Sequence, residues 1–213
     1  MKEALFGELR TALENFDVET AKRVAQKVID TNINAIDAIE LGLLPGLRII
    51  GNKFSSGEYF LPELMLGAKV FKEAAAILEQ KMPLGERPTK GTIVLGTVKN
   101  DVHDIGKNLV GTMLSMAGIR VVDIGVDCSP EKFIDKAIEV NAQIIGASAL
   151  LTITMEKQRE IIEVLRRMDL KKRFKVVVGG AAVDETWAKE IGADGYAENA
   201  QEAVTLVSSL LGR

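Results

Sequence analysis

His103 is the only histidine in this chain of 213 residues, and Asp101 stands two residues before it. The histidine follows an apolar run, 92–98, that is typical of a buried strand, and precedes an amphipathic segment that is typical of a helix. Open α/β sheets bind their ligands at such strand-to-helix junctions. A carboxylate this close could hold the imidazole in one tautomer, as it does for many metal-ligating histidines. The pair therefore indicates a metal ligand with its orienting carboxylate.

The rest of an ordinary metal site is missing from the sequence. One histidine and one cysteine, Cys128, cannot build a conventional cage of protein ligands. If His103 binds a metal, something other than the protein must supply most of the ligands. The alternative is an imidazole that caps a helix or simply lies on the surface.

Beyond residue 91, short apolar runs alternate with amphipathic segments. Continuous apolar strands separated by helices indicate a parallel sheet that is covered on both faces. We therefore predict a flavodoxin-like (Rossmann-type) five-stranded parallel sheet with the strand order 2-1-3-4-5. The expected strands are 92–98, 121–124, 144–148, 175–178 and 194–196. The expected helices are 106–117, 130–140, 155–168, 184–191 and 200–211.

In this strand order the first, third and fourth strands are neighbours, so the loops after them share one edge of the sheet. The loop after the third strand offers hydroxyl groups at Ser148, Thr152 and Thr154. The fourth strand ends in Gly179 and Gly180, where a bulky group can lie close to the backbone. Together the loops predict a deep slot beside the histidine, lined by small residues and hydroxyl groups.

The N-terminal part is predicted to be a helical bundle, because its apolar residues recur at helical spacing throughout. The expected helical stretches are 5–16, 18–29, 36–50 and 62–80. Gly42 and Pro45 interrupt the third stretch, and Pro45 is expected to open a new helix. The expected organisation is a helical cap domain over 1–82, a linker rich in proline, glycine and charge over 83–91, and an α/β domain over 92–213.

The composition excludes several classes of protein. A net charge of −3, a pI of about 5.4 and the lack of a basic cluster argue against a nucleic-acid surface. The single cysteine excludes an internal disulfide and suits a reducing compartment. No apolar stretch approaches the roughly 20 residues that span a membrane, and the N-terminus lacks the apolar core of a signal peptide. We expect a cytoplasmic protein with neither nucleic acid nor membrane as a partner.

Three motifs occur in order: Asp101-x-His103-x-x-Gly106, Ser148-x-Leu150 and Gly179-Gly180. Between them lie 41 residues from Gly106 to Ser148 and 28 from Leu150 to Gly179. With these motifs at this spacing, the chain resembles the corrinoid (cobalamin-binding) methyl-carrier proteins of methyltransferase systems and the cobalamin module of methionine synthase. Segment 54–63 is similar to the cap signature of that family. The resemblance covers essentially the whole chain.

The resemblance implies base-off, His-on cobalamin, in which the dimethylbenzimidazole leaves cobalt and His103 becomes the lower ligand. Asp101 would bind the other ring nitrogen, and Thr154, where methionine synthase has serine, would complete the relay. The displaced nucleotide tail would lie in the slot. The resemblance implies His103 as the metal ligand. It also implies a dry lid over the upper corrin face, formed by Phe54, Leu61 and Leu64. The other implied cofactor contacts are Asp101, Gly106, Ser148, Leu150, Thr152, Thr154, Gly179 and Gly180.

The resemblance also implies a carrier rather than a self-sufficient enzyme, with no catalytic residue of its own. Cobalt would take a methyl group from a substrate-specific methyltransferase of the methylamine, methanol, methoxyaromatic or betaine type. It would give that group to a second methyltransferase with a pterin or thiol acceptor, and a reductive activase would rescue oxidised cobalt. The sequence identifies neither the donor nor the acceptor.

Three other functions compete with this one. A cobalamin-based sensor or regulatory protein would share the cap and the sheet but would need an output domain, which we do not expect here. A serine hydrolase using Ser148 and His103 would need a G-x-S-x-G elbow, and 146–150 lacks its last glycine. A phosphate-binding switch would need a P-loop, and Gly106-Lys107-Asn108 lacks both its upstream glycine and its Ser/Thr.

Overall fold

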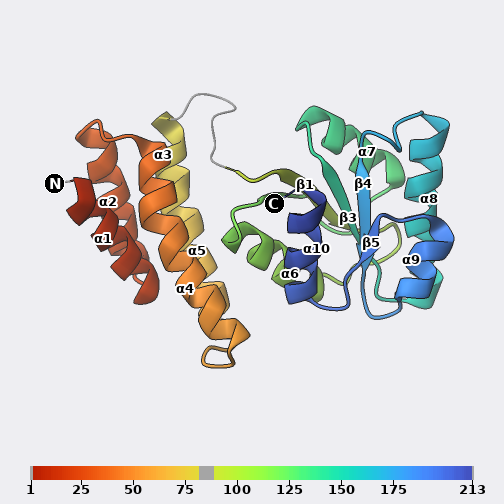
Figure 1. Cartoon of the computed structure of the whole chain (residues 1–213), viewed down its shortest axis with the longest axis horizontal. Helices are drawn as coiled ribbons and strands as arrows, with labels where there is room; N and C mark the ends of the chain where they lie inside the picture. The colour runs from red at the N-terminus through yellow and green to blue at the C-terminus, as the bar shows by residue number, and fades with distance from the viewer. Residues whose placement is uncertain (1, 82–88, 213) are drawn as a thin grey trace. The chain divides into compact units, whose positions relative to one another are not determined.

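The computed structural model describes residues 2–81 and 89–212, which form two compact units. The first unit holds the N-terminal helices and the second holds all five strands (Figure 1). Most of the expected linker, 83–91, falls outside the described residues, so its boundaries stay a prediction. Among the residues described, no helix is both long and apolar enough to cross a membrane.

The helical unit is built on aliphatic side chains, as the periodicity predicts. Leu9 and Leu13 of the first helix and Val24 of the second are completely buried. Asp17 caps the second helix, where its carboxylate accepts the backbone N–H of Thr20 at 2.9 Å. The elements are α1 (Lys2–Glu14), α2 (Val18–Asp30), α3 (Ala35–Asp37), a π-helical turn (Ala38–Leu43), α4 (Leu44–Ser55), α5 (Leu61–Leu78) and a 3₁₀ turn (Glu79–Lys81).

The interruption expected near Pro45 is a change of helix type and not a gap. Helical residues run without a break from α3 to α4, and the N–H of Leu44 donates to the carbonyl of Ile39, five residues back. Proline has no N–H to offer the carbonyl four residues before it. That carbonyl, of Leu41, accepts the guanidinium of Arg10 at 3.1 Å instead. Pro45 lies in the first turn of α4, where proline is tolerated.

The second unit has the predicted sheet. The five strands are parallel in the order β2-β1-β3-β4-β5. Each expected strand is present within a residue or two of its expected ends. The strands are β1 (Thr92–Thr97), β2 (Arg120–Asp123), β3 (Ile144–Ser148), β4 (Lys175–Gly179) and β5 (Gly195–Tyr196). The helices are α6 (Ile105–Met116), α7 (Pro130–Glu139), α8 (Thr152–Arg167), α9 (Glu185–Ile191) and α10 (Ala200–Leu210).

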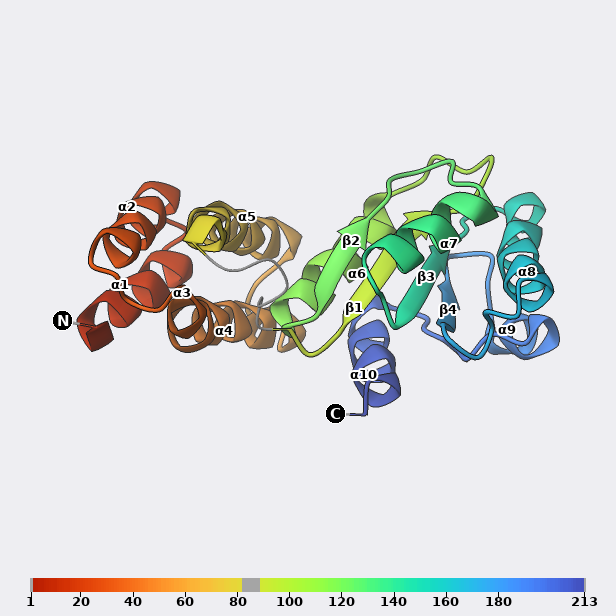
Figure 2. The same ribbon diagram turned by 90° about the horizontal axis from the view of Figure 1, so that it is seen from above.

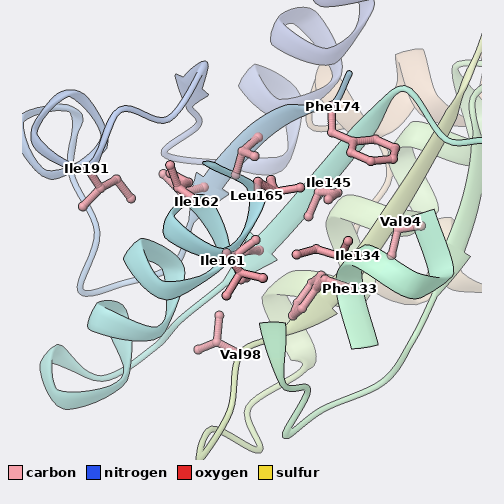
Figure 3. Close-up of a cluster of buried hydrophobic side chains, with 14 of the residues drawn as sticks. Val94, Val98, Phe133, Ile134, Ile145, Ile161, Ile162, Leu165, Phe174 and Ile191 are labelled. Carbon is pink, nitrogen blue, oxygen red and sulfur yellow. The ribbon is translucent and has the colours of Figure 1, made fainter. Parts of the chain in front are cut away.

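The two faces of the sheet are filled differently. On one face, side chains of α7, α8 and α9 make a continuous core with alternate strand residues. Figure 3 shows Phe133 and Ile134 of α7 and Ile161 of α8 gathered against Ile145 of β3. Helices α6 and α10 lie over the other face. Figure 2 shows these two helices and the strands in a view from above. A cavity takes the place of a packed core on that second face.

Candidate functional site

Asp101 is the anchor of the site, because its side chain is completely buried in the loop after β1. One carboxylate oxygen, Oδ1, accepts the backbone N–H of His103 at 3.0 Å and faces Nδ1 of the same residue at 2.7 Å. The other oxygen, Oδ2, accepts the N–H of Leu150 and the hydroxyl of Thr154, each at 2.8 Å. Both oxygens are therefore satisfied, and the carboxylate ties the loop after β1 to the loop after β3.

The hydrogen bonds to Asp101 set its charge. Burial raises the pKa of this carboxyl group, but the donated bonds from the N–H groups of His103 and Leu150, then those from Thr154 and the imidazole, outweigh burial. The net result lowers the pKa of Asp101 from 3.8 to about 2. The buried group is thus a fixed carboxylate at neutral pH.

His103 presents one ring nitrogen for a ligand. Nδ1 faces the carboxylate of Asp101, which can only accept a hydrogen bond, and this leaves Nε2 as the ring nitrogen available to a metal. The side chain is 48% exposed, and its backbone carbonyl accepts the hydroxyl of Thr97 at 2.9 Å. No group of three or more His, Cys, Asp or Glu residues suited to a metal is present among residues 2–81 and 89–212. The donor set therefore fits a metal that brings its own ring of ligands.

A cavity of about 640 Å³ opens beside His103. It lies between the sheet and helices α6 and α10. The expected site residues that line it are His103, Gly106, Ser148, Leu150, Gly179 and Gly180. Glu198 and Asn199, which precede α10, also line it. A chain whose loops converge on such a slot can hold an elongated ligand end-on next to the imidazole.

Two predicted hydroxyl groups lie elsewhere than expected. Helix α8 begins at Thr152, three residues before its predicted start at 155, so Thr152 and Thr154 belong to its first turn and not to a loop. Neither residue lines the cavity. Thr154 is buried and acts on Asp101, whereas Thr152 is exposed, so a cofactor contact for Thr152 stays a prediction.

Gly180 and Gly106 differ in whether the fold itself requires a glycine at that position. Gly180 has a φ of 122°, and a Cβ there would lie 2.0 Å from the carbonyl oxygen of Ala149, so the fold itself requires glycine. At Gly106 a Cβ would meet nothing within 4 Å. The fold leaves open space at that position, beside His103 and on the wall of the cavity. A cradle of this kind suits a bulky group that lies against the start of α6.

Exposed apolar side chains lie close to His103 in the chain. Val102 precedes it and is 69% exposed, and Ile105, the first residue of α6, is 78% exposed. Ile153 in the first turn of α8 is 79% exposed. Large apolar groups that face water on a monomer mark a binding surface. Next to a lone metal ligand, they suit a wide, flat, largely apolar molecule, and a corrin ring has these properties.

One buried amide that the sequence did not point to holds the strands next to the cavity. Gln158 of α8 is completely buried and donates to the carbonyls of Ala147 and Gly179 at 2.9 and 3.1 Å. Its oxygen accepts the indole N–H of Trp187 at 3.0 Å. The amide therefore fixes the ends of β3 and β4 from the filled face of the sheet. In the sequence, a glutamine on the otherwise apolar face of a predicted helix is the feature that could have indicated a buried, hydrogen-bonded amide.

Asp127 is a second missed residue, in the loop after β2. Its carboxylate accepts the N–H of Asn100 at 2.9 Å and lies 3.0 Å from the ammonium of Lys99. Its own N–H donates to the carbonyl of Asp101 at 2.9 Å. The bond from Asn100, followed by that from Lys99, lowers the pKa of Asp127. Asn100 and Asp127 both have positive φ, 66° and 52°, so two left-handed residues clamp each other beneath Asp101.

The residues expected to form a lid belong to the helical unit. Phe54 lies near the end of α4 and is half-buried, and Leu61 begins α5 and is 40% exposed. Leu64 is completely buried. A side chain that is fully packed has a structural role whether or not it touches a ligand. Their role over the upper corrin face stays a prediction.

Comparison with known proteins identifies both halves. A B12 binding domain model matches residues 91–205, and a second model of the same description matches residues 5–79. A corrinoid protein of Desulfitobacterium hafniense is 45% identical over 213 residues, covering 99% of each chain. A dimethylamine corrinoid protein of Methanosarcina acetivorans is 44% identical over 211 residues, covering 99% of this chain and 97% of the relative.

A solved structure agrees with these matches. The methanol:cobalamin methyltransferase complex from Methanosarcina barkeri contains a chain with a TM-score of 0.90 and 26% sequence identity. The likeness covers 100% of this chain and 81% of that one. The arrangement of Asp101 and His103, the single available metal ligand and the domain matches agree with one another, and the chain belongs to the cobalamin-binding corrinoid proteins.

Proposed function

We propose that this protein carries a methyl group on the cobalt of a bound corrinoid between two methyltransferases. The observation that carries the proposal is the imidazole of His103, held by Asp101 and offered as one metal ligand beside a cavity of about 640 Å³. When bound, the corrinoid supplies a cobalt centre that can accept and release a methyl group.

The chain's own residues would hold and orient that cofactor. His103 would bind cobalt through Nε2, and the fixed carboxylate of Asp101 would keep the proton on Nδ1. Thr154 and the N–H of Leu150 would keep the carboxylate in place through their bonds to its second oxygen. The nucleotide tail of a base-off corrinoid would enter the cavity past Ser148 and Gly179. Phe54, Leu61 and Leu64 would exclude water from the methyl-bearing face.

The relatives favour a methylamine as the methyl donor. A dimethylamine corrinoid protein is 44% identical to this chain and a trimethylamine corrinoid protein is 38% identical, each covering 99% of it. The likeness to the methanol complex is at 26% identity. We therefore place a dimethylamine-type methyltransferase first among the candidate partners. A second methyltransferase with a pterin or thiol acceptor and a reductive activase complete the proposed system. The sensor alternative has no observation in its favour.

Corrinoid loading tests the first part of the proposal. Purified protein is mixed with hydroxocobalamin and passed over a desalting column, and the absorbance spectrum of the retained corrinoid is recorded. We expect about one corrinoid per chain with a nitrogen-ligated spectrum, and His103→Ala should give a spectrum without that ligand. Glu139→Gln on α7, remote from the cavity, should behave like the wild type. A chain that retains no corrinoid, or a spectrum that is indifferent to His103, would contradict the proposal.

Methyl transfer tests the second part. Loaded, reduced protein is incubated with dimethylamine, trimethylamine, monomethylamine or methanol and the matching purified methyltransferase. The change in corrinoid absorbance on methylation reports which pair is productive. We expect the dimethylamine pair to react fastest. Reaction with none of them would leave a loaded corrinoid protein but contradict a methyl carrier of these classes.

A further inference from the structure

The inner part of the cavity is built entirely from apolar side chains and glycine. Ile93 and Leu95 of β1, Leu114 of α6 and Val207 of α10 form much of its wall. Ile93, Leu114 and Val207 are at most 1% exposed, so they pack closely against their neighbours and leave almost no surface that water reaches. Val177 of β4 faces the same space.

Apart from Lys107, the polar side chains of the lining lie at the carboxyl edge of the sheet. Ser148 ends β3, while His103 and Asp104 lie in the loop after β1, and Glu198 and Asn199 in the loop before α10. These residues can meet the sugar and phosphate of a nucleotide tail near the mouth. They are too close to the edge to serve a group at the inner end.

Lys107 also lines the cavity, but its ammonium group is already paired with other side chains. It lies in the first turn of α6, and its side chain is 1% exposed. The ammonium group is 2.6 Å from the carboxylate of Asp123 and donates to the side chain of Asn108 at 2.8 Å. Only the carbon chain of Lys107 is left for the cavity wall.

Within the described residues, the backbone beside the inner end of the cavity has no free hydrogen-bonding groups to offer a ligand. The strands beside it are paired, β1 with β3 and β3 with β4, along their whole shared length. Beyond the first turns, which lie at the carboxyl edge of the sheet, the amides of α6 and α10 are used within the helices. A polar atom that enters this end loses its water and finds no partner.

We infer that the cavity selects corrinoids by the polarity of the base at the end of the nucleotide tail, and prefers benzimidazole to a purine. The inference rests on the proposed function, since it requires the tail to enter this cavity. Outside its sugar bond, dimethylbenzimidazole carries a single nitrogen and is otherwise apolar. Adenine carries several ring nitrogens and an amine. Each such group buried without a partner weakens binding by roughly 10- to 100-fold.

Equilibrium binding to three corrinoids tests the inference. Hydroxocobalamin, its adenine-based analogue and cobinamide, which lacks the base, are titrated into the purified full chain. Corrinoid absorbance and the fluorescence of Trp187, the only tryptophan, give the Kd. We expect cobalamin to bind tightest and the adenine analogue at least about 10-fold more weakly. Equal affinity for the two bases, or cobinamide as tight as cobalamin, overturns the inference while leaving the proposed function intact. Failure of all three to bind overturns the proposed function as well.

Matched substitutions on the two faces of β4 locate the effect. Val177→Thr adds a hydroxyl group to the cavity wall without changing the shape of the side chain. The ratio of the Kd for the adenine analogue to the Kd for cobalamin should therefore fall several-fold. Val176→Thr makes the same change on the filled face and should leave the preference unchanged. If Val177→Thr lowers the thermal unfolding temperature too far, Ala203→Ser on α10 makes the same comparison from the opposite wall. A preference that both cavity variants leave unchanged overturns the inference.

Discussion

The hydroxyl of Thr154 donates to Oδ2 of Asp101 at 2.8 Å, and joins two residues that are 53 positions apart in the chain. Both side chains are buried, and the bond links the first turn of α8 to the loop that carries His103. Hydrogen bonds to a buried charge contribute about 1.5–3 kcal/mol to stability. The orientation of the imidazole thus depends on a side chain from another part of the sheet edge.

Replacing this hydroxyl group should weaken both the fold and the site. We expect Thr154→Val, which keeps the shape, to lower the free energy of unfolding by about 2 kcal/mol. The variant should also bind hydroxocobalamin more weakly, because Asp101 loses a donor that fixes it. Thr154→Ser restores the hydroxyl group and should behave nearly as the wild type. Urea denaturation and corrinoid titration measure the two effects, and equal behaviour of the valine and serine variants would refute the relay.

The charge of Asp101 should make stability depend on acid. Its pKa is about 2 in the folded chain against 3.8 for the free group, so the carboxylate stabilises the fold above pH 3.8. This stabilisation, about 2 kcal/mol, is lost as the pH falls from 3.8 toward 2. Asp101→Asn has no such charge, so its unfolding free energy should fall less over the same range. The measurement is urea denaturation of both proteins between pH 6 and pH 2, and parallel curves would contradict the expected role.

Asp127 should matter to the site through the loop that it clamps. Asp127→Ala removes the acceptor for the N–H of Asn100 and the ion pair with Lys99. We expect a measurable loss of stability and weaker His103-dependent corrinoid binding, because the backbone of Asn100 loses its acceptor. Asp127→Asn keeps an acceptor and should recover part of each. Asp169→Ala, at another left-handed aspartate with a φ of 55°, controls for the conformational effect. Corrinoid binding that the alanine variant leaves intact would show that the clamp does not position the site.

Two glycines of the site should respond in opposite ways to alanine. Gly180→Ala places a methyl group 2.0 Å from the carbonyl oxygen of Ala149, so the chain should unfold at a much lower temperature or fail to fold. Gly106→Ala meets nothing within 4 Å and should keep the thermal stability of the wild type. Its methyl group would occupy the space beside His103, so corrinoid affinity should fall at least about tenfold. Normal corrinoid binding by Gly106→Ala would mean that the cofactor does not approach the start of α6.

The sequence was sufficient for the architecture of the sheet. Runs such as 144–148 are apolar on both sides of the strand, which only a doubly covered parallel sheet explains. The expected order of the strands, which the structure has, is enough to place His103, Ser148 and Gly179 at one edge. The corrinoid resemblance and the match of both halves to B12 binding domains agree.

The residue pattern alone did not predict features that depend on contacts between distant parts of the chain, although the family resemblance implied the relay through Thr154. Thr152, Ile153 and Thr154 are β-branched and disfavour helix, so the pattern placed the start of α8 after them. The hydroxyl of Thr154 instead finds Asp101 and makes that turn stable. Gln158 and Asp127 depend in the same way on partners that sequence spacing does not reveal. The π-helical turn before Pro45 is a similar case, because Arg10 supplies the missing donor.

The unequal filling of the two sheet faces has a consequence for folding, because the packed face does not depend on a cofactor. The apolar cluster of α7, α8 and α9 is complete without any ligand, and it lies on the face away from the cavity. A zinc finger is different, since it has no fold to offer until its metal arrives. Here we expect the chain to fold before corrinoid is present, which makes loading a separate and later step in the life of the molecule.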